Sequence, residues 1–398
     1  MSPVSLQAGD GRWLLPEGIE ELLPADARRV EHLRRELLDL FDRWGYELVL
    51  PPLIEYAESL LIGLGQDLDL HTFKLTDQLS GRTLAVRPDI TPQVARIDAH
   101  SLRRPGPARL CYAGSVLHTR PRSPLASRSP IQLGAELYGD ASLAADLEIV
   151  CLMIEMLCAA GVQDITLDLG HVGIGRALMD RAGFPPELRA ALFDALQRKA
   201  DASIRALLAE APGDRAVATM IGTLATLNGD RSVLEEASRV LSEAPPGVGA
   251  SLAALAEVAD ALAARLPGIT LHFDLGELHG YDYHTGLVFA AYAPGQGEAL
   301  ANGGRYDDIG RVFGRARPAT GFSADLKALL GLGCGESAAP RTAVFVPHAL
   351  AGQAWPEVQR LRAAGERVVL GLPGECAPGA CDRELRAAEN GGWLILPL

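Results

Sequence analysis

The stretch that most constrains the fold of this chain covers residues 276–307, GELHGYDYHTGLVFAAYAPGQGEALANGGRYD. Apolar runs typical of β-strands flank a polar, aromatic turn at 280–286, and a second glycine-rich turn at 302–307 closes the unit. Because glycine lets the backbone approach other atoms closely, phenol, carboxylate and imidazole groups at adjacent glycine turns can line a pocket. The stretch therefore predicts a pocket for a small polar ligand, or else an ordinary hairpin with polar side chains on its surface.

The composition is that of a globular protein. The chain has 398 residues, 48% of them hydrophobic, which predicts two or three domains. No run of about 18 uncharged apolar residues suggests a membrane span, and the first residues do not resemble a secretory signal. The six cysteines are scattered without a CxxC pair, which favours a reducing, cytoplasmic location. We expect no cofactor and no metal, although Cys376, Cys381 and His348 could form a zinc site.

The formal net charge of −13 is a poor basis for binding nucleic acid. One dense basic region stands apart from this acidic average and can be either a solvated loop or a local RNA-binding face. It contains Arg103, Arg104, Arg109, Arg120, Arg122 and Arg128.

The first 140 residues predict a helix followed by several strands. Residues 25–44 carry apolar side chains at helical spacing, and residues 46–50 read as a strand that ends at two prolines. A further helix is expected to begin near Thr91 and Pro92. Further strands are expected at residues 72–76 and 83–87, and on both sides of a loop within 109–139.

The remainder of the chain predicts three further parts. After a buried helix at 143–159 and a strand at 165–169, residues 171–264 have helical spacing without strand signals. We therefore expect a helical insertion that splits a main domain into residues 1–170 and 265–330, in which residues 321–326 open a last helix. A linker then leads to an α/β domain at 341–398. We expect this domain to alternate strand, helix, strand, helix and strand, with the second helix at 383–389.

Two pairs of polar residues suggest where a ligand would bind. Gln132 and Glu136 lie four apart on a predicted strand and therefore point to one face of it, which suggests a polar cavity or an edge strand in water. Asp89 and Thr91 flank a predicted helix start, where Asp89 could equally be a turn residue.

These segments resemble the histidyl-tRNA synthetase family of class II aminoacyl-tRNA synthetases. The helix and strand of 25–50 are similar to the motif that forms the dimer interface in that class, so the resemblance implies a homodimer. LAVRPDITPQVAR resembles the family's stretch that holds the histidine amino group, and GYDYHTG with GGRYD resembles its histidine-specific signature. The resemblance implies an α+β class II fold, with an antiparallel sheet flanked by helices, and a histidine site. That site would comprise Asp89, Thr91, Gln132, Glu136, Tyr283, His284 and Tyr306.

The chain departs from the synthetase pattern where that family carries catalytic arginines. His118, His279 and Ala328 occupy the three arginine positions, and Lys327 lies beside the last of them. Arginine suits these positions because its guanidinium remains charged and forms bidentate hydrogen bonds with phosphate. His284 also stands where the family has tyrosine. We therefore expect no working synthetase and no catalytic residue, although the amino-acid pocket is largely kept.

The α/β domain at 341–398 resembles the start of the synthetases' anticodon-binding domain and is truncated relative to it. An amino-acid pocket that lacks the catalytic arginines, combined with this truncation, resembles the family of ATP phosphoribosyltransferase regulatory subunits. This resemblance implies a non-catalytic partner of the short-form catalytic subunit in histidine biosynthesis, with histidine as effector. It also implies a hetero-oligomer, expected to be a hetero-octamer, without tRNA or membrane binding. The alternatives are a divergent histidyl-tRNA synthetase and a class II-like ligase or RNA-binding module that uses the basic region.

Overall fold

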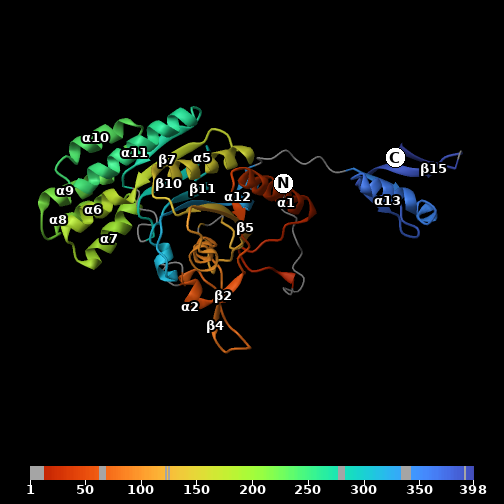
Figure 1. Cartoon of the computed structure of the whole chain (residues 1–398), viewed down its shortest axis with the longest axis horizontal. Coiled ribbons are helices and arrows are strands. Elements are labelled where there is room, and N and C mark those ends of the chain that lie inside the picture. Colours follow the sequence, from red (N-terminus) through yellow and green to blue (C-terminus); the bar gives the residue numbers. More distant parts are fainter. Residues whose placement is uncertain are drawn as a thin grey trace. The chain divides into compact units, whose positions relative to one another are not determined.

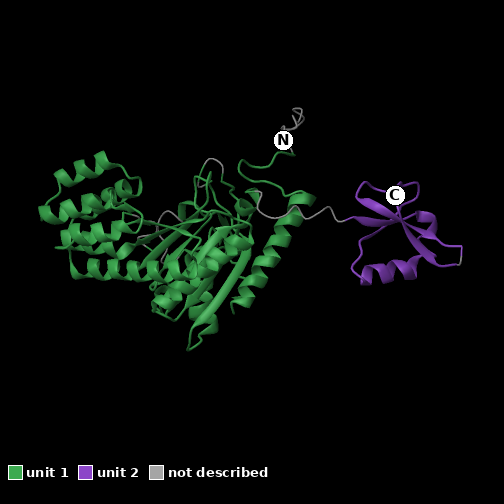
Figure 2. Cartoon of the chain, turned by 90° about the horizontal axis from the view of Figure 1, so that it is seen from above, with its two compact units in different colours: residues 1–334 green, residues 335–398 purple. Residues whose placement is uncertain are grey.

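The computed structural model describes residues 13–61, 69–121, 123, 126–276, 283–332, 342–389 and 391–398. Contacts divide the chain into two compact units, residues 1–334 and 335–398 (Figure 2). Each unit is described below by itself. The predicted turn 280–286 lies partly outside the described residues, as do most of the predicted linker and the candidates His279 and Arg122.

A nine-stranded sheet forms the centre of the first unit, in the order β1-β5-β6-β12-β11-β10-β7-β9-β8. Neighbouring strands run antiparallel, as predicted, except for the parallel pairs β1–β5 and β7–β9. The strands are β1 (Glu47–Leu48), β5 (Ala108–Ser115), β6 (Ile131–Tyr138), β7 (Thr166–His171), β8 (Asn228–Gly229), β9 (Thr270–Asp274), β10 (Leu287–Tyr292), β11 (Ala301–Arg305) and β12 (Ala319–Asp325).

One face of this sheet is covered by helices α1 (Pro24–Arg43) and α5 (Leu143–Ala159) (Figure 1). Leu133 and Leu137 of β6 point into that core. The predicted last helix begins later than expected, because β12 continues to Asp325 and α12 covers Leu326–Gly331. Pairing of β12 with both β11 and β6 keeps residues 321–325 extended.

The opposite face carries Gly134, Glu136 and Tyr138 of β6, since side chains alternate along a strand. A short helix α4 (Thr91–Arg96) lies over it and continues as a π-helical turn, η2 (Ile97–Leu102). The neighbouring pieces are α2 (Ala57–Leu60), the 3-10 helix η3 (Ile309–Phe313) and a small sheet of β2 (Ile54–Tyr56), β4 (Thr83–Val86) and β3 (Lys74–Thr76).

Six helices between β7 and β9 lie together at one end of the large sheet (Figure 1). They are α6 (Val172–Ala182), α7 (Pro186–Gln197), α8 (Asp201–Ala209), α9 (Arg215–Leu224), α10 (Ser232–Val240) and α11 (Pro246–Arg265). The segment is helical as predicted, but it also contains the two-residue strand β8. Among the described helices, α11 alone is long and apolar enough to span a membrane; Leu252, Leu255 and Leu262 bury one side of it in the protein core.

The described residues of the second unit form a four-stranded sheet in the order β14-β13-β15-β16 and one α-helix. Its elements are β13 (Ala343–Val346), η4 (His348–Leu350), α13 (Trp355–Ala363), β14 (Val368–Leu370), β15 (Cys381–Ala387) and β16 (Trp393–Pro397). The predicted helix at 383–389 is wrong. Those residues belong largely to β15, because pairing with β13 and β16 outweighs the helix propensity of the Arg- and Glu-rich run.

A buried ion pair ties the sheet to α5. Arg305, at the end of β11, lies 3.0 Å from Asp146 of α5 and 3.2 Å from Asp307. The Arg305 and Asp146 side chains are only 9% and 7% exposed, and Arg305 also donates to the carbonyl oxygens of Asp140 and Ser142. Burial raises the pKa of the Asp146 carboxyl, and the Arg305 charge opposes that rise.

We predict that Arg305→Ala lowers the free energy of unfolding by about 3–5 kcal/mol, because it leaves the Asp146 carboxyl buried without its cation. Urea denaturation of both proteins measures the difference. Arg311→Ala is the matched control, since the Arg311–Asp308 pair is exposed and should contribute about 1 kcal/mol or less. Equal losses in the two variants would contradict the role assigned to the buried pair.

Candidate functional site

A buried carboxylate lies at the centre of the candidate site. Glu136 of β6 is 1% exposed, and its Oε1 accepts hydrogen bonds from Thr91 Oγ1 at 2.9 Å and from the Tyr112 hydroxyl at 3.1 Å. The Tyr306 hydroxyl donates to Oε2. Burial raises the pKa of the Glu136 carboxyl well above its usual range, and the Thr91 and Tyr112 hydroxyls act in the opposite direction.

Glycines in the neighbouring strands leave room for this cluster. Gly321 of β12 pairs with Glu136, and a Cβ atom at Gly321 would lie 1.6 Å from Glu136 Oε2. Gly134 faces Tyr112 across β5 and β6, and its Cβ would lie 2.4 Å from the Tyr112 hydroxyl. Because glycine has no side chain, the Glu136 and Tyr112 side chains can lie against the backbone of Gly321 and Gly134.

A second polar group lies beside the carboxylate. Gln132 Nε2 donates to Asp89 Oδ1 at 2.8 Å, and Gln132 Oε1 accepts from the Ile90 backbone N–H at 2.8 Å. Asp89 Oδ1 also accepts from the Thr91 backbone N–H at 3.0 Å, so Asp89 acts as the turn residue considered above as well as lying in the pocket. The group thus combines an acceptor carboxylate with fixed amide and hydroxyl groups, a suitable environment for an ammonium ion.

Three aromatic side chains form the third part of the site. The Tyr283 ring stacks on Tyr306 at 5.0 Å between centroids, and the His284 ring meets Tyr283 edge-on at 5.2 Å. The Tyr283 hydroxyl is buried and finds no hydrogen-bond partner among the described residues. A buried hydroxyl without a partner is costly, so a polar ligand at this point would be stabilised by it.

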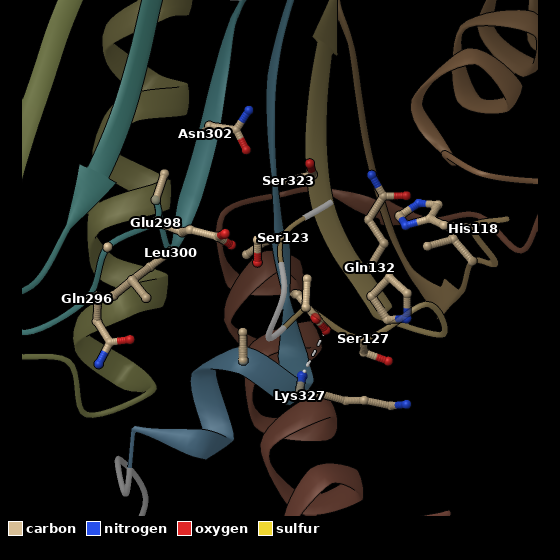
Figure 3. A pocket seen from close by; sticks show the side chains of 18 of the residues that line it. His118, Ser123, Ser127, Gln132, Gln296, Glu298, Leu300, Asn302, Ser323 and Lys327 are labelled. Atoms are coloured by element: carbon tan, nitrogen blue, oxygen red, sulfur yellow. Dashed lines mark hydrogen bonds between the residues drawn. The ribbon is translucent and has the colours of Figure 1, made fainter. Parts of the chain in front are cut away.

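A cavity of about 680 Å³ adjoins the polar groups at Gln132 (Figure 3). His118 and Ala328, two of the positions where synthetases carry arginine, both line it. His118 is buried and its Nε2 lies 2.9 Å from Pro88 O, so this ring supports the backbone before Asp89. Lys327 also lines the cavity, but its ammonium donates to Glu20 at 2.7 Å.

No arginine lines this cavity among the described residues, whereas the carboxylates of Glu298 and Asp325 do. A triphosphate would therefore meet negative charge and no guanidinium from the described lining. His279, the third substituted arginine position, lies outside the described residues.

The structure brings all seven predicted site residues together. Gln132 and Glu136 do share one face of β6, and the alternative of an edge strand in water is wrong, because β6 lies between β5 and β12 and both side chains are buried. Sequence reasoning missed Tyr112. The signal available was its place on the first of the two strands predicted within 109–139, although only the register with Gly134 reveals the contact.

The described residues contain no group of His, Cys, Asp or Glu side chains that could hold a metal ion, and this includes Cys376, Cys381 and His348. In the pocket the Thr91 hydroxyl is bonded to the Glu136 carboxyl and to the Tyr112 phenol. The arrangement is therefore suited to binding a small cationic or zwitterionic molecule with a ring that can donate a hydrogen bond.

Two family models match the chain. The histidyl-tRNA synthetase model matches residues 18–329, and the model of the C-terminal domain of ATP phosphoribosyltransferase subunit HisZ matches residues 341–396. The ATP phosphoribosyltransferase regulatory subunits of Pseudomonas paraeruginosa and Azotobacter vinelandii are 58% and 56% identical to it. Each alignment spans 391 residues, 97% of this chain and 98% of the relative.

Solved structures agree with the sequence matches. A protein from Bacillus halodurans, described as an ATP phosphoribosyltransferase regulatory subunit/histidyl-tRNA synthetase, has a TM-score of 0.81 and 30% identity, covering 93% of this chain and 95% of its own. Histidyl-tRNA synthetase from Nostoc has the same fold, with a TM-score of 0.75 at 17% identity and 97% coverage of both chains. The chain belongs to the family of ATP phosphoribosyltransferase regulatory subunits, whose main domain has the class II fold of histidyl-tRNA synthetases.

Proposed function

We propose that this chain binds the short-form catalytic subunit of ATP phosphoribosyltransferase in the cytoplasm, raises its activity and conveys inhibition by histidine. The observation that carries the proposal is the contrast between two adjoining sites. The polar side chains around Glu136 are present and hydrogen-bonded to one another, while the adjoining cavity has His118 and Ala328 where a synthetase needs arginine. A sensor requires a ligand site without the chemistry that would consume its ligand.

In this proposal, histidine lies with its ammonium group against Asp89, Thr91 and Gln132. Its imidazole ring takes a place at Glu136, close to the aromatic side chains of Tyr283, His284 and Tyr306. The imidazole N–H replaces one of the hydroxyl donors that the Glu136 carboxyl now uses. A buried carboxyl that lost a donor without replacement would be destabilised, so the site should prefer ligands that supply a donor at this point.

A divergent histidyl-tRNA synthetase is the alternative that the fold itself would permit. Amino-acid activation develops negative charge at the ATP α-phosphate, and removing one contact to such charge typically costs about 10²–10³ in rate. His118 is committed to the Pro88 carbonyl, and the Lys327 ammonium to Glu20. Neither is placed to replace a lost arginine, so we favour the regulatory role and expect no tRNA charging.

We further propose a homodimer within a larger hetero-oligomer, expected to be a hetero-octamer from the family resemblance. Strand β1 lies at one edge of the large sheet, where its unpaired side could meet another chain. Leu48, Leu50 and Leu53 are exposed on this strand and after it, with Leu50 76% exposed. Large apolar side chains gathered at a sheet edge favour a contact with a second copy.

We predict that Glu136→Gln and Glu136→Ala both weaken histidine binding, by about 10–100-fold, because each removes a charge-assisted hydrogen bond contributing about 1.5–3 kcal/mol. Calorimetric titration measures the affinity of each variant. Glu257→Ala, which removes an exposed carboxylate from α11, is the control and should bind histidine as the unaltered chain does. Unchanged affinity in both Glu136 variants would exclude Glu136 from the site.

We also predict that mixing this chain with a short-form catalytic subunit increases the rate of phosphoribosyl-ATP formation, and that added histidine suppresses that increase. Light scattering of the mixture and of each component reports the complex and the homodimer. No complex and no change in rate would contradict the regulatory proposal. Pyrophosphate exchange with ATP and histidine, measured on the chain alone, would then test the synthetase alternative.

A further inference from the structure

The helical insertion holds the aromatic part of the pocket directly. The backbone N–H of Val172, at the start of α6, donates to Gly286 O at 3.0 Å. One turn later on the same helix, Arg176 Nη2 donates to His284 O at 2.8 Å. Two hydrogen bonds from one side of α6 therefore fix the backbone of segment 283–286, which carries Tyr283 and His284.

The same segment is bonded on its other side to the end of β11. The Thr285 N–H donates to Arg305 O at 2.7 Å, and the Asp307 N–H donates to Thr285 Oγ1 at 3.0 Å. Tyr306 lies between Arg305 and Asp307 in the sequence; its ring stacks on the Tyr283 ring, and its hydroxyl donates to Glu136. A continuous series of contacts therefore runs from Glu136 through Tyr306 and segment 283–286 to α6.

Helix α6 is attached to the sheet at its start and packed against other helices of the insertion. It begins directly after β7, whose last residue His171 pairs with Leu287 of β10 and accepts the Gly173 N–H through Nδ1 at 3.1 Å. Burial, followed by the nearby charges of Arg176 and Arg305, lowers the pKa of His171 to about 4, so the ring stays neutral and keeps this acceptor at neutral pH. Ile174 and Leu178 are fully buried in the common core, and α6 packs against α9 and α11.

From these contacts we propose that Arg176 is a positioning residue that couples histidine occupancy of the pocket to the helical insertion. The inference rests on the proposed histidine site and adds the element that responds to it. When an imidazole takes the place of the Tyr306 hydroxyl at Glu136, Tyr306 and the stacked Tyr283 must adjust. Arg176 and Val172 transmit that adjustment to α6, and the packed helices move or stiffen with it.

The guanidinium makes the larger contribution to this link because it is a charged donor to a backbone carbonyl at the pocket itself. The second bond, from Val172, involves backbone only and persists in every side-chain variant. Loss of Arg176 should therefore weaken the coupling between pocket and insertion, while the bonds of Val172 and Thr285 continue to hold segment 283–286.

Hydrogen–deuterium exchange of the full chain, with and without saturating histidine, tests the proposal. In the unaltered chain we expect histidine to slow amide exchange severalfold both in residues 283–306 and in α6. In Arg176→Ala we expect the calorimetric affinity for histidine to change by less than about tenfold and slower exchange in 283–306 to remain, while the effect in α6 is largely lost. Arg181→Ala, an exposed position on the same helix, is the control and should behave as the unaltered chain.

Arg176→Lys keeps the charge and should restore part of the α6 response; it also replaces the alanine variant if that protein does not fold. The coupling would be overturned if histidine slowed amide exchange in α6 equally in both Arg176 variants and in the unaltered chain. It would also be overturned if histidine bound the unaltered chain without changing amide exchange in α6. Absence of histidine binding to the unaltered chain would instead overturn the proposed function, and this inference with it. Calorimetry on the unaltered chain separates these results.

Discussion

The burial of one carboxyl group explains most of the architecture around the candidate site. Glu136 lies on β6, an interior strand of the nine-stranded sheet, and is 1% exposed, so that an unpaired charge there would be strongly destabilising. The protein supplies three hydroxyl donors, from Thr91 at the start of α4, Tyr112 on β5 and Tyr306 after β11. Since no side-chain cation contacts this carboxyl in the described structure, a ligand that brings a donor or a positive charge would complement it.

The cluster has also fixed the sequence of the strands around it. Gly321 and Gly134 are required where the Glu136 and Tyr112 side chains cross the neighbouring backbone. The buried pair of Arg305 and Asp146 anchors the end of β11 and thereby sets the position of Tyr306, the next residue. By contrast, the adjoining cavity has a histidine and an alanine at two positions where synthetases carry arginine. The packing requirements that the structure shows are therefore concentrated around Glu136, and no arginine from the described residues lines the cavity next to it.

Strand periodicity, a local property, predicted only part of this site, and the full set of seven residues came from the resemblance to histidyl-tRNA synthetases. Gln132 and Glu136 lie four residues apart, which placed them correctly on one face of β6. Tyr112 could not be identified in the same way, since its contact depends on the register between β5 and β6. The link from Arg176 to His284 joins residues 108 positions apart, and no local pattern in the sequence signals it. The wrong helix at 383–389 has a similar origin, because pairing on both sides of β15 determines its conformation more strongly than the preferences of its charged residues.

A crystal structure of the chain grown with saturating histidine tests the central claim most directly. The account predicts histidine in the pocket, with its imidazole within hydrogen-bond distance of Glu136, its ammonium group near Asp89 and Gln132, and the Tyr306 hydroxyl displaced from the carboxyl. Histidine bound elsewhere, with the hydrogen bonds of Glu136 unchanged, would contradict it.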